Sequence, residues 1–169
     1  VVNVISKSPR KLKGSSATFG FGGFDRPDAD AGSLWYLSGT YADAPNERWS
    51  YKLSGGGYSQ DALARPTGDI ACNISSVCTG ATGTGVYPPF ANEGTTQPKF
   101  DARVDYDIAS GGTVTFSGGV AGTEGIIHSG VGPFDISSDT RMTYFTTRYQ
   151  KGGRRLAVFT NVLDGDAGN

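Results

Sequence analysis

The chain has 169 residues, a length that suits one domain, and its 15 basic and 16 acidic residues leave a net charge of −1. This balance gives no case for nucleic acid or an anionic membrane surface as a partner. The 26 glycines and 11% aromatic residues favour an all-β chain. No segment approaches the roughly 18 consecutive apolar residues of a transmembrane helix.

Seven strand-like segments follow one another along the chain, at 15–24, 33–42, 48–60, 98–107, 113–122, 138–149 and 154–163. Tight turns at 43–47, 108–112 and 150–153 alternate with longer connections at 25–32, 61–97 and 123–137. An antiparallel up-and-down sheet with turns at one end and long loops at the other is the layout of a transmembrane β-barrel. The alternation therefore predicts a segment of such a barrel, with about seven strands and an incomplete circumference.

The segment at 98–107 has the clearest alternation of apolar and polar residues. Its apolar positions are Phe100, Ala102, Val104 and Tyr106, and its polar positions are Asp101, Arg103, Asp105 and Asp107. Residues two apart lie on the same side of a strand, so the two sets occupy opposite faces of the sheet. The polar face suits a hydrated lumen and open solvent equally, and the apolar face suits lipid or the core of a β-sandwich.

Aromatic residues gather toward the ends of the expected strands. Tyr41, Trp49, Tyr106 and Tyr149 lie beside the short turns, and Trp35, Tyr58 and Phe100 lie nearer the long connections. Two belts of amphipathic rings, one at each membrane interface, are typical of outer-membrane barrels. Packing of the same rings in a sandwich core is the alternative.

The connection at 61–97 is rich in Gly, Thr, Pro and Ser and contains both cysteines, Cys72 and Cys78. No second Cys pair or His cluster accompanies them, so their spacing does not indicate a zinc site. A local disulfide formed in an oxidising compartment is the favoured interpretation. Two unpaired thiols are the alternative.

No other group of residues predicts catalysis or a bound cofactor. His128, the single histidine, has no nucleophile elbow around it and is interpreted as a solvated loop residue. Asp164, Asp166 and Asn169 could offer oxygen ligands to calcium, but they lack the remaining spacing of an EF-hand and also suit an ordinary turn. We therefore expect no enzymatic activity and no cofactor.

The opening segment Val2-Asn3-Val4-Ile5-Ser6-Lys7 resembles the end of the plug domain of TonB-dependent outer-membrane receptors. The shared pattern is a hydrophobic residue, Asn, two β-branched residues, Ser or Thr, and a basic residue. In that family the first barrel strand follows within about ten residues, and here the segment 15–24 does so. The resemblance implies that 1–9 is the last strand of a plug domain and that 10–169 is the N-terminal part of the barrel.

The resemblance also implies a function and a set of partners. It implies a plugged barrel of about twenty-two strands in the outer membrane, which takes up a scarce ligand such as a siderophore, cobalamin, glycan or peptide. The partners would be the rest of the plug and barrel, outer-membrane lipid, an extracellular small ligand, and the inner-membrane TonB complex through an upstream segment. Asp101, Arg103, Asp105 and Asp107 would then line the lumen, where they could pair with the plug or guide the ligand.

Other interpretations remain open at this point. The chain starts inside a strand without Met and ends in a turn-rich stretch, which leads us to expect a fragment of a longer protein. A secreted β-sandwich or lectin-like binding module would turn the same apolar faces inward against a second sheet. A porin or adhesin barrel without a plug would use 1–7 as one more strand, and a hydrolase on an all-β scaffold has the least support.

Overall fold

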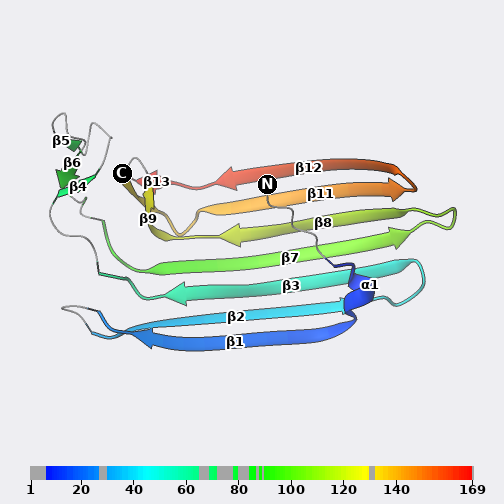
Figure 1. Cartoon of the computed structure of the whole chain (residues 1–169), viewed down its shortest axis with the longest axis horizontal. Coiled ribbons are helices and arrows are strands. Elements are labelled where there is room, and N and C mark those ends of the chain that lie inside the picture. The colour runs from blue at the N-terminus through cyan, green and yellow to red at the C-terminus, as the bar shows by residue number, and fades with distance from the viewer. Residues whose placement is uncertain are drawn as a thin grey trace.

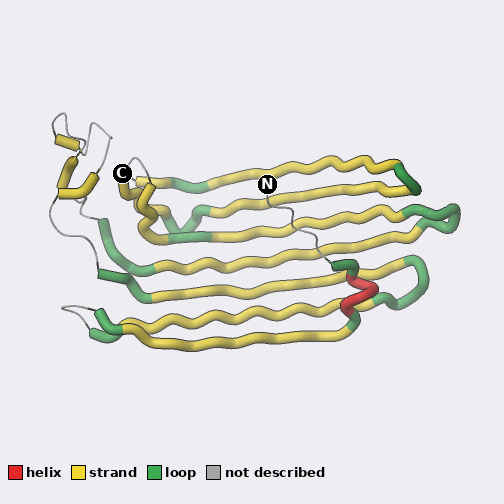
Figure 2. The backbone as a smooth tube through the Cα atoms, viewed as in Figure 1, coloured by secondary structure: helices red, strands yellow, loops and turns green. Residues whose placement is uncertain are grey.

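A computed structural model of the chain describes residues 7–26, 30–64, 69–71, 78–79, 84–86, 88, 90–129 and 132–168. The protein is all-β, with one helical turn, α1 (Pro9–Leu12), before the first strand (Figure 2). Proline at the start of α1 suits this turn because the first N–H groups of a helix have no intrahelical partner.

One antiparallel sheet of seven strands dominates the structure, in the spatial order β1-β2-β3-β7-β8-β11-β12. Its strands are β1 (Gly14–Phe24), β2 (Gly32–Asp43), β3 (Trp49–Gln60), β7 (Thr95–Asp107), β8 (Thr113–Gly122), β11 (Arg141–Lys151) and β12 (Arg154–Asp164). The seven strands follow one another in the sheet in the same order as along the chain, and neighbouring strands are antiparallel. The topology of this sheet is therefore up-and-down. The sheet is open, and β1 and β12 form its two edges.

All seven predicted strands are confirmed, with shifts of two or three residues at three of their ends. The strand β11 ends at Lys151 and not at 149, because Gln150 and Lys151 still pair with Arg155 and Arg154 of β12. The strand β7 begins at Thr95 and not at 98, because Thr95 and Thr96 still pair with Gln60 and Ser59 of β3. The strand β11 begins at Arg141 and not at 138, because the N–H of Thr140 donates to the carbonyl of Ser137 at 3.0 Å and closes a turn.

The alternation of connections is also confirmed, and it sorts the two kinds of connection to opposite ends of the sheet. The turns β2–β3, β7–β8 and β11–β12 lie together at one end, which also holds α1 (Figure 1). The longer connections lie at the other end. We call these the short-turn end and the long-loop end.

The long connections contain strands that the sequence did not predict. The β3–β7 connection holds β4 (Asp69–Ala71), β5 (Cys78–Thr79) and β6 (Thr84–Val86), which form a small sheet in the order β4-β6-β5. The β8–β11 connection holds the hairpin β9 (Gly125–Ser129) and β10 (Gly132–Ile136), and β13 (Ala167–Gly168) pairs with β10 after β12 has ended. The long-loop end is therefore built from segments far apart in the sequence.

The register of the seven strands gathers their large apolar side chains on one face, because residues directly opposite in an antiparallel ladder share a face. Leu53 pairs with Tyr41 and Ala102, and Phe116 pairs with Val104 and Thr147. This face, the apolar face, carries Phe19, Phe21, Trp35, Leu37, Tyr41, Trp49, Tyr51, Leu53, Phe100, Ala102, Val104, Tyr106, Val114, Phe116, Val120, Phe145, Tyr149, Leu156, Val158 and Val162.

The opposite face, the polar face, carries most of the charged and hydroxyl side chains of the strands. It includes Ser50, Lys52, Ser54, Asp101, Arg103, Asp105, Asp107, Thr113, Thr115, Ser117, Tyr144 and Arg148. Apolar side chains return to it near the β12 edge, where Met142, Phe159 and Leu163 are exposed. On the apolar face of the strands, charges occur only at the ends: Asp43, Lys151 and Arg154 at one, Arg141 and Asp164 at the other.

Tyrosine and tryptophan mark the short-turn end of the apolar face. Tyr41, Trp49, Tyr51, Tyr106 and Tyr149 lie within three residues of a short-turn end of their strands, and the rings of Trp49 and Tyr106 are 4.6 Å apart. The second expected belt is less regular: Trp35 lies on the apolar face, but Tyr58 pairs with Tyr36 on the polar face. Tyr58 does not join the belt, because the position of a residue near a strand end does not determine the face of the sheet on which its side chain lies.

The apolar face is exposed. Phe21 is 73% exposed, Phe145 53% and Val158 62%, and the only buried hydrophobic residues among those described are Ala42 and Ala44. Soluble monomers rarely expose an apolar patch of more than a few hundred Å². The sheet as described therefore needs an apolar environment or another apolar surface against this face.

Candidate functional site

The polar side chains of β7 form the centre of a hydrogen-bonded cluster on the polar face. Arg103 holds Asp105 in a fork, with Nε at 2.8 Å from Oδ1 and Nη2 at 2.9 Å from Oδ2. Asp105 is only 3% exposed. Two further residues converge on Asp101: Lys52 Nζ lies 3.6 Å from its Oδ1, and the hydroxyl of Tyr144 donates to its Oδ2.

The N-terminal segment is fastened to this cluster. Ser8 Oγ donates to Asp105 Oδ2 at 3.2 Å, and Arg10 Nη2 lies 3.1 Å from Asp107 Oδ2. Arg10 also donates to the carbonyl oxygens of Asn46 and Glu47, both at 2.9 Å, in the β2–β3 turn. Arg10 therefore links the chain before β1 to both a short turn and β7.

The same contact buries part of the polar face. The turn α1 contacts β2, β3 and β7, and both Pro9 and Ser50 are fully buried. Thr113 Oγ1 donates to Asp107 Oδ1 at 2.7 Å and fixes this carboxylate from the β8 side. Two of the four predicted polar residues of β7, Asp105 and Asp107, thus bind the segment that precedes β1. The sequence had suggested only that these four residues could pair with a plug or guide a ligand.

The residues that carry the family resemblance lie mostly outside the described part of the chain. Val2, Asn3, Val4, Ile5 and Ser6 are not among the described residues, and Lys7 is exposed. Cys72 is also outside the described residues, and Cys78 opens the short strand β5. The plug-end strand and the disulfide stay predictions.

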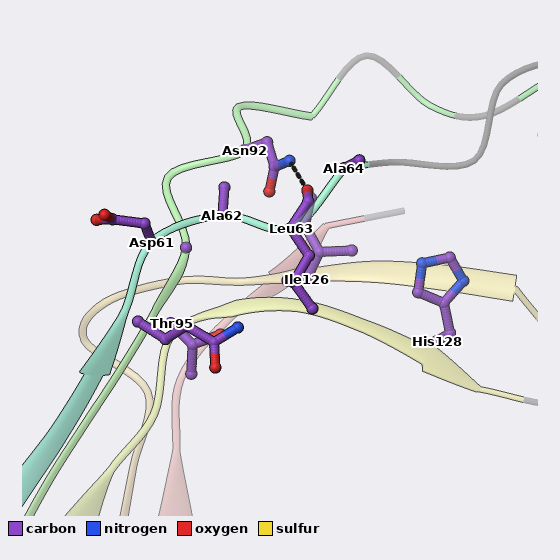
Figure 3. Close-up of a pocket in the computed structure, with 10 residues that line it drawn as sticks. Asp61, Ala62, Leu63, Ala64, Asn92, Thr95, Ile126 and His128 are labelled. Atoms are coloured by element: carbon purple, nitrogen blue, oxygen red, sulfur yellow. Dashed lines mark hydrogen bonds between the residues drawn. The ribbon is translucent and has the colours of Figure 1, made fainter. Parts of the chain in front are cut away.

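The long-loop end holds a cavity of about 220 Å³ between the base of the β3–β7 connection and the hairpin β9–β10. It is lined by Gln60, Asp61, Ala62, Leu63, Ala64, Asn92, Gly94, Thr95, Ile126 and His128. Figure 3 shows Asn92 Nδ2 bonded to the Leu63 carbonyl, at 2.8 Å, and Ile126 and His128 of β9 line the same cavity. Its size suits one ring or one side chain of a larger ligand, since drug-sized sites begin near 300 Å³.

The base of this cavity is held by close backbone contacts. Gly94 has φ +98°, and a Cβ there would lie 2.2 Å from the Gln60 carbonyl oxygen. Only glycine fits such a position without strain. The close approach of 94 to β3 therefore sets where the β3–β7 connection returns to the sheet.

A second hydrogen-bonded group joins β2 to the start of the same connection. Asp61 Oδ2 accepts from Ser33 N at 2.7 Å and from Ser33 Oγ at 2.9 Å. These bonds from the Ser33 backbone and side chain lower the pKa of Asp61, because they favour its charged form. The Asp61 carboxylate points away from the other labelled side chains in Figure 3, so it is not directed at the residues that line the rest of the cavity.

Two of the residues considered for calcium, Asp164 and Asp166, have partners within the chain, and Asn169 lies outside the described residues. Asp164 pairs with Arg141 at 3.3 Å, and the carbonyl of Asp166 accepts from the N–H and the hydroxyl of Ser137. His128 lies on β9 at the cavity, opposite Pro133 of β10. In the part of the chain that the structure describes, no three His, Cys, Asp or Glu residues gather as a metal site would require.

The two ends of the sheet carry opposite charge. Among the described residues at the long-loop end, the basic residues Arg26 and Arg141 are outnumbered by Asp25, Asp30, Asp61, Glu93, Glu124, Asp135, Asp139, Asp164 and Asp166. Among those at the short-turn end, the acidic residues Asp43, Glu47, Asp105 and Asp107 are outnumbered by Lys7, Arg10, Lys11, Lys13, Arg48, Lys151, Arg154 and Arg155. The net charge of −1 conceals this separation.

Sequence reasoning missed the partners of the predicted residues. The roles of Ser8, Arg10 and Tyr144 depend on contacts across 97, 97 and 43 positions of the chain. The charge separation could have been found from the sequence, by comparing the residues around short and long connections.

Comparisons with protein-family models, with curated proteins and with solved structures give no match for the chain. None of the described residues belongs to a helix with the length and hydropathy of a membrane span.

Proposed function

We propose that the chain forms part of the wall of a TonB-dependent receptor in the outer membrane, which serves the uptake of a scarce extracellular ligand. The observation that carries the proposal is the exposed apolar face, which extends over all seven strands and bears charges only at its ends. Its strands have 10 to 13 residues, and tilted strands of about 9–11 residues cross a bilayer.

The aromatic residues support the same proposal. Tyr41, Trp49, Tyr106 and Tyr149 would lie at the interface on the short-turn side, where amphipathic rings are favoured. The short-turn end would face the periplasm and the long connections would face outward, as in outer-membrane barrels.

The plug is the part of the proposal that rests on the N-terminal segment. In a plugged receptor the polar face lines the lumen, and the chain leaves the plug close to the periplasmic end of the first strands. The bonds from Ser8 to Asp105 and from Arg10 to Asp107 fasten the residues after the Val2–Lys7 motif to the polar face at that end. This arrangement supports a barrel in which residues 1–9 form the last strand of a plug domain.

The wall would be passive in this protein, and recognition would belong to the outward connections and the plug. The cavity beside Asn92 and His128 lies among these connections. We propose transport and not catalysis, with no resident cofactor.

The experiment that tests the location is fractionation of the full protein, expressed from its gene in a Gram-negative host. We expect it in the outer membrane, resistant to extraction by alkaline carbonate. Recovery as a soluble periplasmic or secreted protein would contradict the proposal and favour the β-sandwich module, whose apolar face is covered by a second sheet.

A second experiment separates a plugged receptor from other barrels. The purified periplasmic domain of TonB should bind the full protein, and deletion of the sequence upstream of Val1 should abolish the binding. A protein that fractionates with the outer membrane but does not bind TonB would instead be an unplugged porin or adhesin barrel.

A further inference from the structure

The tip of the β11–β12 hairpin places two positive charges opposite each other. Lys151 pairs directly with Arg154 across the turn Gly152–Gly153, on the apolar face. Like charges at directly opposite positions destabilise a ladder. At the other end of the same hairpin, Arg141 is opposite Asp164 and the two form an ion pair at 3.3 Å. The hairpin thus carries a neutral pair at one end and a doubly positive pair at the other.

No acidic side chain compensates the positive pair within the described residues. The ion pairs there do not include Lys151 or Arg154, and both side chains are exposed. Lys151 Nζ donates to the hydroxyl of Ser110 at 3.2 Å, which is a neutral acceptor. An anion from outside the chain would relieve the repulsion.

The pair adjoins the aromatic end of the apolar face. The next rung on that face is Tyr149 opposite Leu156, so apolar and aromatic side chains give way to cations within two residues. Lys and Arg side chains lay their apolar stems along such a boundary and extend the charged group toward polar head groups.

We propose that Lys151 and Arg154 bind the phosphate groups of anionic phospholipids in the leaflet at the short-turn end. The inference rests on the proposed membrane location. A guanidinium contacts two oxygens of one phosphate, and an ammonium beside it adds a point charge. One head group would thus bridge the two cations and offset their repulsion. The partner is a phospholipid and not a nucleic acid, because the pair adjoins an apolar surface.

Quenching of tryptophan fluorescence by brominated lipids can measure whether anionic lipid is preferred over neutral lipid at each end of this hairpin. Tyr149→Trp places a reporter two residues from Lys151, and Thr143→Trp places a matched reporter on the same face two residues from Arg141. All other Trp residues of the full protein are replaced by Phe. The protein is reconstituted in phosphatidylcholine vesicles that contain brominated phosphatidylglycerol or, in parallel, brominated phosphatidylcholine.

At the Tyr149→Trp reporter we expect quenching by brominated phosphatidylglycerol to exceed quenching by brominated phosphatidylcholine about fivefold, since each nearby basic residue attracts anionic lipid. The Thr143→Trp reporter should show no preference. Addition of Lys151→Gln and Arg154→Gln, or of about 0.5 M salt, should remove the difference at the first reporter. The double variant should be at least as stable as the parent in phosphatidylcholine, because it removes repulsion.

Two results distinguish failure of this inference from failure of the proposed function. Equal quenching by both lipids at the Tyr149→Trp reporter would overturn the lipid site and leave the membrane wall intact. Absence of quenching by either lipid at both reporters would contradict a bilayer around the apolar face, and the lipid site with it.

Discussion

The two faces of the seven-stranded sheet use the same strands in different ways. On the polar face, Asp105 is 3% exposed and has partners in Arg103 and Ser8. On the apolar face, Phe116 of β8, which is opposite Val104 of β7, is 42% exposed although it is apolar. The polar face pairs the carboxylates of Asp101, Asp105 and Asp107 within the chain, whereas the apolar face leaves large apolar side chains exposed.

The difference shows that the polar side of this sheet, and not an apolar core, organises the described structure. In a soluble sandwich the reverse is expected, because burial of apolar area is the main favourable contribution to folding. A lipid-facing wall needs no apolar core of its own, since its surroundings are apolar. The following substitutions compare the two faces directly.

Removal of the buried carboxylate should have the largest effect. Asp105→Ala takes away the forked partner of Arg103 and the acceptor of Ser8, and the loss of one member of a buried pair costs about 3 kcal/mol. Asp164→Ala, which removes a pair whose side chains are 62% and 68% exposed, should cost about 0.5 kcal/mol or less. Urea unfolding of the full protein in lipid vesicles measures the loss of stability for each variant. Equal losses would mean that the pair of Arg103 and Asp105 is not buried in the folded protein.

Two adjacent threonines in the middle of β11 test the apolar face. Thr147 pairs with Phe116 and Val158 on the apolar face, and Thr146 pairs with Ser117 on the polar face. Thr147→Arg should lower the free energy of unfolding in vesicles by about 2 kcal/mol, because it exposes a charge to hydrocarbon. Thr146→Arg should change it by about 0.5 kcal/mol. Similar losses for both variants would argue against lipid on one face only.

Arg10 tests the attachment of the N-terminal segment to the polar face. Arg10→Ala removes bonds to Asp107 and to the carbonyls of Asn46 and Glu47, with an expected loss of about 1 kcal/mol because these groups are partly exposed. Hydrogen exchange should quicken in the 44–48 turn. Lys11→Ala is the control, since Lys11 is an exposed neighbour in α1, and it should leave the exchange unchanged.

The bond between Asp61 and Ser33 predicts a small pH effect at the long-loop end. The pKa of Asp61 is lowered in the folded protein, so its contribution to stability is complete above the ordinary value of about 3.9 and is lost as pH falls through the lowered value. An NMR titration of the labelled carboxyl should have its midpoint below about 3.9, and Ser33→Ala should raise this midpoint. A midpoint at the ordinary value in the parent would contradict the bond.

Much of the sheet could be predicted from sequence because its strands alternate with period two. The segment 98–107 predicted both faces of β7 correctly, since Phe100 and Asp101 differ so clearly in polarity. The phase of 154–163 was undetermined, because Leu156 and Phe159 are both apolar. Only the register settles it, with Leu156 on the apolar face and Phe159 on the polar face.

The small strands and the partners of the charged residues could not be predicted in this way. The strands β9 and β10 form a hairpin too short for alternation to give a signal, and β13 pairs with β10 across some thirty positions, between Asp135 and Gly168. The site partners are still more distant in sequence, since Ser8 and Asp105 are 97 positions apart. Local patterns determine faces, whereas contacts between segments depend on how the whole sheet is assembled.

A scan of spin labels along β8 tests the lipid-facing wall most directly. Single cysteines at positions 114, 115, 116, 117 and 120, introduced in the full protein with Cys72 and Cys78 replaced by Ser, are labelled and placed in vesicles. Access to oxygen should alternate with period two, high at Val114, Phe116 and Val120 and low at Thr115 and Ser117, because oxygen concentrates in hydrocarbon. Uniformly low access at both sets would show that the apolar face is covered by protein and would contradict a membrane wall.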